Sequence, residues 1–118
     1  MKNNAEIGRY GENLALKFLK YRNCEILESN FRTKSSEIDI IMRDGEYVVF
    51  VEVKYRKNTT KGNPCEAVTS RKQNAIIEAA NHYICENQLS NIDFRFDVIE
   101  IIDIDKLEIN HIKNAFTL

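Results

Sequence analysis

Two charged residues interrupt an otherwise apolar run, and their types and spacing suit metal-ion and phosphate chemistry. Glu52 and Lys54 lie within Tyr47–Tyr55, a run rich in Val, Tyr and Phe that predicts a β-strand. Because side chains two residues apart point to the same face of a strand, this carboxylate and ammonium share a face at a spacing of about 7 Å. A partly exposed salt bridge also accounts for the pair, so the triplet by itself is a weak motif.

A third candidate, Asp39, lies in the preceding apolar run, Glu37–Met42. The dipeptide Asp44-Gly45 predicts a two-residue turn between the two runs. Counting outward from that turn puts Asp39 opposite Phe50 and diagonal to Glu52, about 7 Å away at the backbone and on the same face. A one-residue slip would separate the two carboxylates, because it turns every side chain of a strand to the other face.

Carboxylates that converge in this way repel one another and resist burial unless a cation neutralises them. Oxygen ligands suit Mg²⁺ or Mn²⁺, and a nearby lysine can stabilise charge that develops on a phosphate or orient an activated water. Glu37, which the same count puts opposite Glu52, is either a supporting acid or a solvent-facing strand end. Judged on spacing alone, a salt bridge between Lys54 and a carboxylate is the favoured interpretation.

The elements that must position these residues follow from hydrophobic periodicity. The chain predicts a helix to about Tyr21 capped by Asn3 or Asn4, strands Glu25–Phe31, Glu37–Met42 and Tyr47–Tyr55, a helix from its cap Ser70 to near Asn87, and strands Phe94–Ile102 and Leu107–Ile112. The order α-β-β-β-α-β-β, with no internal repeat, predicts an α/β fold in which helices flank a mixed sheet.

The first predicted helix carries its large apolar residues on one stripe. These residues are Ile7, Tyr10, Leu14 and Phe18. Gly8 and Gly11 also lie inside the helix, where each costs about 1 kcal/mol relative to Ala. They indicate either a later helix start or a close approach of this helix to another element.

Length and composition predict a single domain covering residues 1–118. The chain is 43% hydrophobic and 30% charged, with no Pro/Gly-rich stretch, as is typical of a globular protein. The amino terminus lacks the apolar core of a signal peptide, and no apolar run is long enough to span a membrane. We therefore expect a cytoplasmic protein with no membrane role, in which Cys24, Cys65 and Cys85 are reduced thiols.

Basic residues are concentrated in one stretch, although the net charge is −1. The chain up to residue 85 holds 14 Lys/Arg and 11 Asp/Glu, whereas the rest holds 3 and 7. Arg56, Lys57 and Lys61 follow the third predicted strand without an intervening acid. This stretch is either a patch that contacts nucleic-acid phosphates or a solvated loop.

The charged residues also occur within motifs of a known family. Ser36-Glu37-Ile38-Asp39 followed by Phe50–Arg56 resembles the D…E-x-K core of the PD-(D/E)xK nuclease superfamily. Further motifs stand in the order typical of the YraN family of small bacterial proteins: Gly8-x-x-Gly11-Glu12-x-x-Ala15, Asn30-Phe31-Arg32, Gly62-Asn63-Pro64-x-Glu66-Ala67-Val68, Lys72 and Arg95-Phe96-Asp97-Val98. The resemblance covers roughly residues 8 to 101.

The resemblance implies a restriction-endonuclease-like core, related in fold to Holliday-junction resolvases, and it implies roles for individual residues. Asp39 and Glu52 resemble the metal-binding carboxylates, Lys54 the catalytic lysine and Glu12 the first-helix glutamate of many members. Judged on its residues alone, Glu12 lies off the apolar stripe of the helix and is better interpreted as solvated. The carbonyl of Val53 is a further candidate ligand for Mg²⁺ or Mn²⁺.

These observations predict a metal-dependent nuclease that hydrolyses phosphodiester bonds of DNA or RNA. Lys72 is a further candidate for phosphate contact, at a position where an exposed lysine is also common. Two alternatives stay open: a nucleic-acid-binding module without turnover, and a protein-interaction domain in which Lys54 pairs permanently with a carboxylate. The likeness to junction resolvases makes a homodimer an expectation.

Overall fold

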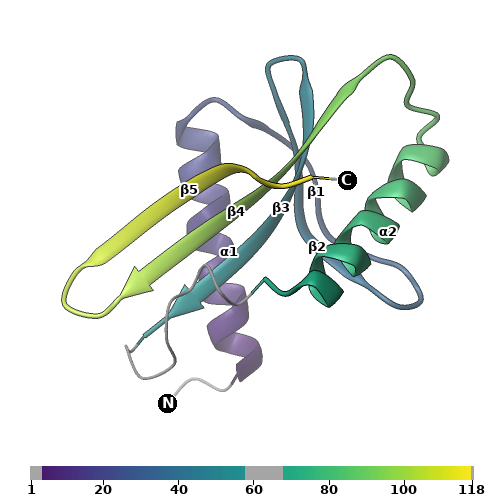
Figure 1. Ribbon diagram of the computed structural model, residues 1–118. Coiled ribbons are helices and arrows are strands. Elements are labelled where there is room, and N and C mark those ends of the chain that lie inside the picture. The colour runs from purple at the N-terminus through teal and green to yellow at the C-terminus, as the bar shows by residue number, and fades with distance from the viewer. Residues whose placement is uncertain (1–3, 58–67, 118) are drawn as a thin grey trace.

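Five strands form one sheet in the spatial order β1-β2-β3-β4-β5. The computed structural model describes residues 4–57 and 68–117, so Asn3, Lys61 and the motif at 62–67 lie outside the described residues. The elements are α1 (Asn4–Tyr21), β1 (Glu25–Arg32), β2 (Glu37–Asp44), β3 (Tyr47–Arg56), α2 (Ser70–Glu86), β4 (Asp93–Asp103) and β5 (Leu107–Phe116) (Figure 1). This order confirms the predicted α/β class.

The sheet is mixed, as predicted. Strands β3 and β4 are parallel, whereas the other three neighbouring pairs are antiparallel. Parallel neighbours need a crossover connection, and α2 lies on that connection. In Figure 1, α1 runs behind strands β3, β4 and β5.

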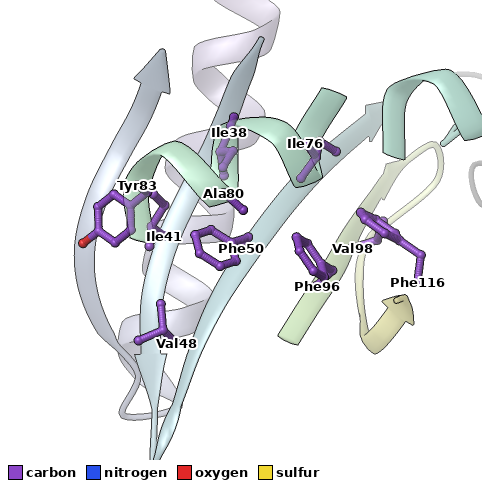
Figure 2. Packing of buried hydrophobic residues seen from close by; sticks show 11 residues of the cluster. Ile38, Ile41, Val48, Phe50, Ile76, Ala80, Tyr83, Phe96, Val98 and Phe116 are labelled. Carbon is purple, nitrogen blue, oxygen red and sulfur yellow. The ribbon is translucent and has the colours of Figure 1, made fainter. Parts of the chain in front are cut away.

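Each helix covers its own cluster of buried side chains. The face of the sheet under α2 is here called the α2 face, and it holds a row of aromatic rings. The ring centroids of Phe50 and Phe96 are 5.5 Å apart, and those of Phe96 and Phe116 are 5.1 Å apart. Figure 2 shows Ile76, Ala80 and Tyr83 of α2 packed over this row. The opposite face, the α1 face, buries a separate cluster against α1. The two clusters set the helices on opposite faces of the sheet.

The buried line of α1 differs from the predicted stripe. Gly11, Ala15 and Leu19 are buried, whereas Ile7, Tyr10, Leu14 and Phe18 are only half-buried. The small residues at the first two positions let the helix backbone lie close to β3, and the larger residues pack along the sides of the contact. The predicted stripe of large apolar residues therefore lies beside the line of α1 that contacts the sheet, not on it.

The start of α2 also differs by one residue from the prediction. Thr69, not Ser70, is the N-cap, and its side-chain oxygen accepts a hydrogen bond from the backbone N–H of Lys72 at 3.2 Å. The helix ends with Asn87 as its C-cap, as expected. No helix in residues 4–57 and 68–117 is long and apolar enough to cross a membrane.

Candidate active site

The hairpin of β2 and β3, which carries the predicted site, pairs in a register that differs by two residues from the predicted one. Its turn is Gly45-Glu46, and Ile41 rather than Asp39 pairs with Phe50. A shift of two residues leaves every side chain on its predicted face. Continued past the last paired residues, the same count brings Asp39 level with Glu52 instead of diagonal to it.

Asp39 interrupts the regular alternation of β2. Ile40 packs in the α1-face cluster, whereas Ile38 packs in the α2-face cluster. A regular strand would put these two residues on the same face. The Asp39 carboxylate accepts a hydrogen bond from the backbone N–H of Val53 at 2.8 Å, next to the point where the paired positions of β2 and β3 end. Asp39 therefore stands between the two faces of the sheet.

Three carboxylates converge beside this interruption. Glu12 comes from α1, and Glu37 and Asp39 come from β2; one oxygen of each lies within 4.8 Å of the others. Asn30 of β1, whose φ is +55°, bridges two of them. With its amide nitrogen facing the acids, Asn30 donates to Oε1 of Glu12 and to Oε1 of Glu37, each at 2.8 Å. Arg32 contacts Glu37 at 3.4 Å from the exposed side.

Glu12 reaches this cluster because α1 lies unusually close to β3. A Cβ placed on Gly11 would stand 2.8 Å from the Cβ of Tyr55, so no side chain fits there without displacing one element. Tyr55 is itself held in place: its hydroxyl donates to Asp103 at 2.7 Å, and the ring of Tyr10 packs edge-on against it at 5.5 Å. The predicted close approach is confirmed at Gly11. It does not extend to Gly8, where an added Cβ would have no neighbouring atom within 4 Å.

Glu52 lies on the other side of Asp39, between two lysines. Its Oε1 is 3.8 Å from the ammonium of Lys54, and its Oε2 is 3.9 Å from that of Lys72. Glu52 is 6% exposed, and its Oε2 is buried without a hydrogen-bond partner. Buried carboxylate oxygens are normally hydrogen-bonded, because an unsatisfied one costs free energy. The site thus holds a buried acid whose partners are incomplete.

The electrostatics of the site disfavour its own negative charge. Burial, followed by the nearby carboxylate of Asp39, raises the pKa of Glu52 to about 8, against the opposing effect of Lys72 and Lys54. Burial, followed by the charges of Asp39 and Glu37, raises the pKa of Glu12 to about 7. Acids held in this way bind a cation or a proton more readily than ordinary surface acids do.

The structure gathers six of the candidate residues in one place: Glu12, Glu37, Asp39, Glu52, Lys54 and Lys72. The described contact of Val53 is through its N–H, so the role of its carbonyl stays a prediction. Arg56 is half-buried at the end of β3, and Lys57 is exposed immediately after it. Lys61 lies outside the described residues.

Sequence reasoning missed two residues of this region. Asn30 appeared only as part of a motif, although an Asn is among the residue types that adopt a positive φ most readily. Glu100 of β4 is 4% exposed and pairs in register with Lys54. Residues two apart in a strand share a face, so Glu100 lies on the same face as Phe96 and Val98. In the sheet this is also the face of Glu52 and Lys54, because β3 and β4 pair in register.

A second buried charge network lies on β4 and β5, away from these acids. Asp97 accepts hydrogen bonds at 2.9 Å from Nε and from a terminal nitrogen of Arg95, and at 2.9 Å from the backbone N–H of Asn114. His111 Nε2 donates to the same carboxylate at 2.7 Å. Arg95 also donates to Asp44 at 2.8 Å. The network ties β5 to the opposite end of the β2–β3 hairpin.

Comparison with known proteins gives one consistent result. Residues 11–101 match the family described as "Uncharacterised protein family UPF0102". A UPF0102 protein of Clostridioides difficile is 47% identical over 114 residues, covering 97% of this chain and 99% of that protein. Relatives from Clostridium perfringens and Geotalea daltonii are 49% and 50% identical, each covering 98% of this chain and 97% and 92% of their own length. The names of these relatives state no activity.

Proposed function

Since the chain belongs to the UPF0102 family, which is the YraN family that its motifs resemble, and since the family description assigns no activity, we propose a function from the site itself. The protein is a divalent-metal-dependent nuclease that hydrolyses phosphodiester bonds of DNA or RNA. It acts in the cytoplasm.

One observation carries this proposal: four carboxylates and two lysines meet where β2 and β3 separate. Glu12, Glu37 and Asp39 present oxygens within 4.8 Å of one another, and Glu52 lies against Asp39 with a buried oxygen that has no hydrogen-bond partner. Such a cluster is unfavourable unless a cation completes it. A merely structural ion pair would not require four acids.

The donor set fits Mg²⁺ or Mn²⁺. All candidate ligands are oxygens, which are the atoms that hard divalent cations prefer, and no described cysteine or histidine belongs to the cluster. Asp39 and Glu52 would hold the ion, with Glu12 and Glu37 as further acids and the Val53 carbonyl as a candidate. When bound, such an ion neutralises phosphate charge and lowers the pKa of a coordinated water.

The residues of the chain have distinct roles in the proposed reaction. Lys54 is partly exposed beside Glu52, so its ammonium can stabilise the negative charge that develops on the phosphate. The Val53 N–H holds Asp39 in one orientation through its 2.8 Å hydrogen bond. Glu12 is held by Asn30, so the cluster is organised before a substrate arrives.

Arg56, Lys57 and Lys61 would contact the phosphates of the substrate beside the site. Arg56 and Lys57 stand at the end of the strand that carries Glu52 and Lys54, so a nucleic acid that reaches the acids passes these cations. A homodimer, which the likeness to junction resolvases suggests, would present two such sites to one substrate.

A cleavage assay with Mn²⁺ tests the proposal. The purified protein should cleave at least one member of a panel of single-stranded, duplex, flap and four-way-junction substrates. Lys54→Ala should lower cleavage without weakening Mn²⁺ binding, because the lysine acts on charge formed in the transition state. Asp39→Asn should lose cleavage and the Mn²⁺-induced rise in melting temperature together, because an ion that binds the native state stabilises it.

Lys113→Ala is the matched control, since Lys113 is an exposed lysine on β5 that contacts Asp44 at 3.9 Å instead of the site. It should cleave as the wild type does. Binding without cleavage across the panel would identify a nucleic-acid-binding module instead, and neither binding nor cleavage would favour a protein-interaction domain. Cleavage that persists in Asp39→Asn would point to a contaminating nuclease.

A further inference from the structure

The second lysine of the site, Lys72, stands where its own helix disfavours a cation. Lys72 lies in the first turn of α2, beside Arg71, and this turn contains no acid. The amino-terminal end of a helix carries a positive dipole, which disfavours nearby cations. An acid would be the ordinary choice there. The cation therefore needs an explanation outside α2.

That explanation is Glu52, which Lys72 reaches across the sheet surface. The ammonium of Lys72 is 3.9 Å from Glu52 Oε2, the oxygen that is buried without a hydrogen bond. Within residues 4–57 and 68–117, the ion pairs of Glu52 are those with Lys54 and Lys72. At 3.9 Å the contact is electrostatic and is longer than a hydrogen bond. Lys72 thus neutralises this oxygen without binding it closely.

The contact is also built to be released. The side chain of Lys72 is 41% exposed, whereas that of Lys54 is 25% exposed and lies on the same strand as Glu52. A long, solvated lysine side chain can turn away at low cost. A divalent cation that approaches Glu52 would repel the ammonium of Lys72 and compete with it for the same oxygen.

We propose that Lys72 is the exchangeable counter-ion of the site: it balances the charge of ionised Glu52 when no divalent cation is bound and is displaced when one binds. This inference rests on the proposed function, because it takes Glu52 as a ligand of the ion. The displaced ammonium remains beside the site, where it is available to a phosphate of the substrate. Metal loading and substrate attraction are then coupled through one side chain.

Mn²⁺ titration without nucleic acid tests the exchange. Lys72→Met keeps most of the apolar stem and removes the charge. It should raise the affinity for Mn²⁺ by about three- to tenfold, the size expected from removing one partly solvated charge. In EDTA, at a pH high enough to ionise Glu52, the same variant should melt at a lower temperature than the wild type, because Glu52 loses a counter-ion, and its Mn²⁺-induced rise in melting temperature should be larger.

Arg71→Met is the control, because it removes an exposed charge from the same turn of α2. It should change the Mn²⁺ affinity much less than Lys72→Met does, and Lys72→Arg should keep the wild-type affinity. An unchanged or weaker Mn²⁺ affinity in Lys72→Met, or an equal rise in Arg71→Met, would overturn the exchange. A raised affinity in a protein that cleaves no substrate would leave the exchange standing and reject the nuclease.

Discussion

Two carboxylates on neighbouring strands of this protein are almost equally buried, and their surroundings are opposite. Asp97 of β4 is 0% exposed and Glu52 of β3 is 6% exposed. Asp97 receives close hydrogen bonds from Arg95, His111 and the backbone of Asn114. Glu52 has two lysines at 3.8 and 3.9 Å and an oxygen with no hydrogen bond.

The pKa values of the two acids move in opposite directions as a result. Burial alone would raise the pKa of Asp97, but the hydrogen bonds from His111, Arg95 and Asn114 outweigh it and the pKa is lowered. Burial and Asp39 raise the pKa of Glu52, and the two lysines do not compensate. A charge buried for structure comes with its full set of partners, whereas a charge buried to receive a ligand is left incomplete. The difference separates an architectural network from a candidate site.

The largest expected effect is on stability, when the complete network is broken. Asp97→Ala should lower the free energy of unfolding by about 3–5 kcal/mol, because it leaves the buried Arg95 without its main partner. Glu52→Gln should leave the stability of the metal-free protein unchanged or raise it, since an uncharged side chain is the form that the fold favours at this position. Urea unfolding at neutral pH in EDTA measures both.

Asp97→Asn provides a milder version if the alanine variant does not fold, because the amide keeps the shape of the carboxylate and removes its charge. It should still be much less stable than Glu52→Gln. Equal losses at the two positions would mean that Glu52 is as well satisfied as Asp97, and the comparison would fail.

The next effect is the pH dependence of stability without metal. The folded state keeps a proton on Glu52 to about pH 8, whereas the unfolded chain releases it near 4.5. The stabilisation from this proton is complete below pH 4.5 and is lost as the pH rises through about 8, a fall of several kcal/mol. Glu12, with a pKa raised to about 7, adds to the fall with the same sign. Urea unfolding at a series of pH values in EDTA measures it.

Asp97 contributes nothing to that slope. Its lowered pKa gives stability that is present above its unfolded value of 3.8 and lost only as the pH falls below it. Glu52→Gln should therefore flatten the slope between pH 5 and 8, and Mn²⁺ should flatten it in the wild type by stabilising the ionised acids. An unaltered slope in Glu52→Gln would assign the titration to other groups.

A third effect concerns the helix contact that delivers Glu12. Gly11→Ala should destabilise the protein by about 1–3 kcal/mol, because the added Cβ would stand 2.8 Å from the Cβ of Tyr55. It should also weaken cleavage by about tenfold or more, since separating α1 from β3 withdraws Glu12. Gly8→Ala is the matched control: it has open space and should gain about 0.5–1 kcal/mol from helix propensity. Thermal melts and cleavage rates of the two variants distinguish the positions.

The smallest effect concerns the amide that joins two acids of the cluster. Asn30→Gly keeps the backbone free to adopt a φ of +55° and removes the hydrogen bonds to Glu12 and Glu37. It should cost about 1 kcal/mol of stability and weaken Mn²⁺ binding severalfold, because Glu12 and Glu37 lose their common support. Asn23→Gly controls for the backbone, since Asn23 has a φ of +65° after α1. If both variants bind Mn²⁺ equally well, the Asn30 amide does not organise the acids.

Periodicity in the sequence determined the element order and the shared face of Glu52 and Lys54. Each conclusion depends on local geometry: about two residues per repeat in a strand and about 3.6 in a helix. The predicted direction of the Asp39 side chain also did not depend on the exact register, because an error of two residues leaves each side chain on the same face of its strand. The turn itself was misplaced by one residue, onto Asp44-Gly45 instead of Gly45-Glu46.

Only the tertiary structure decided which residues complete the site. Glu12 looked solvated in its helix and enters the cluster because Gly11 fits against Tyr55, more than forty positions along the chain. Lys72 and Asn30 join for the same kind of reason, through the placement of α2 and the pairing of β1 with β2. These contacts depend on how segments that are distant in the sequence pack together. The distance between two elements is set by the side chains that fill the space between them, so no periodic pattern in the sequence reveals such contacts.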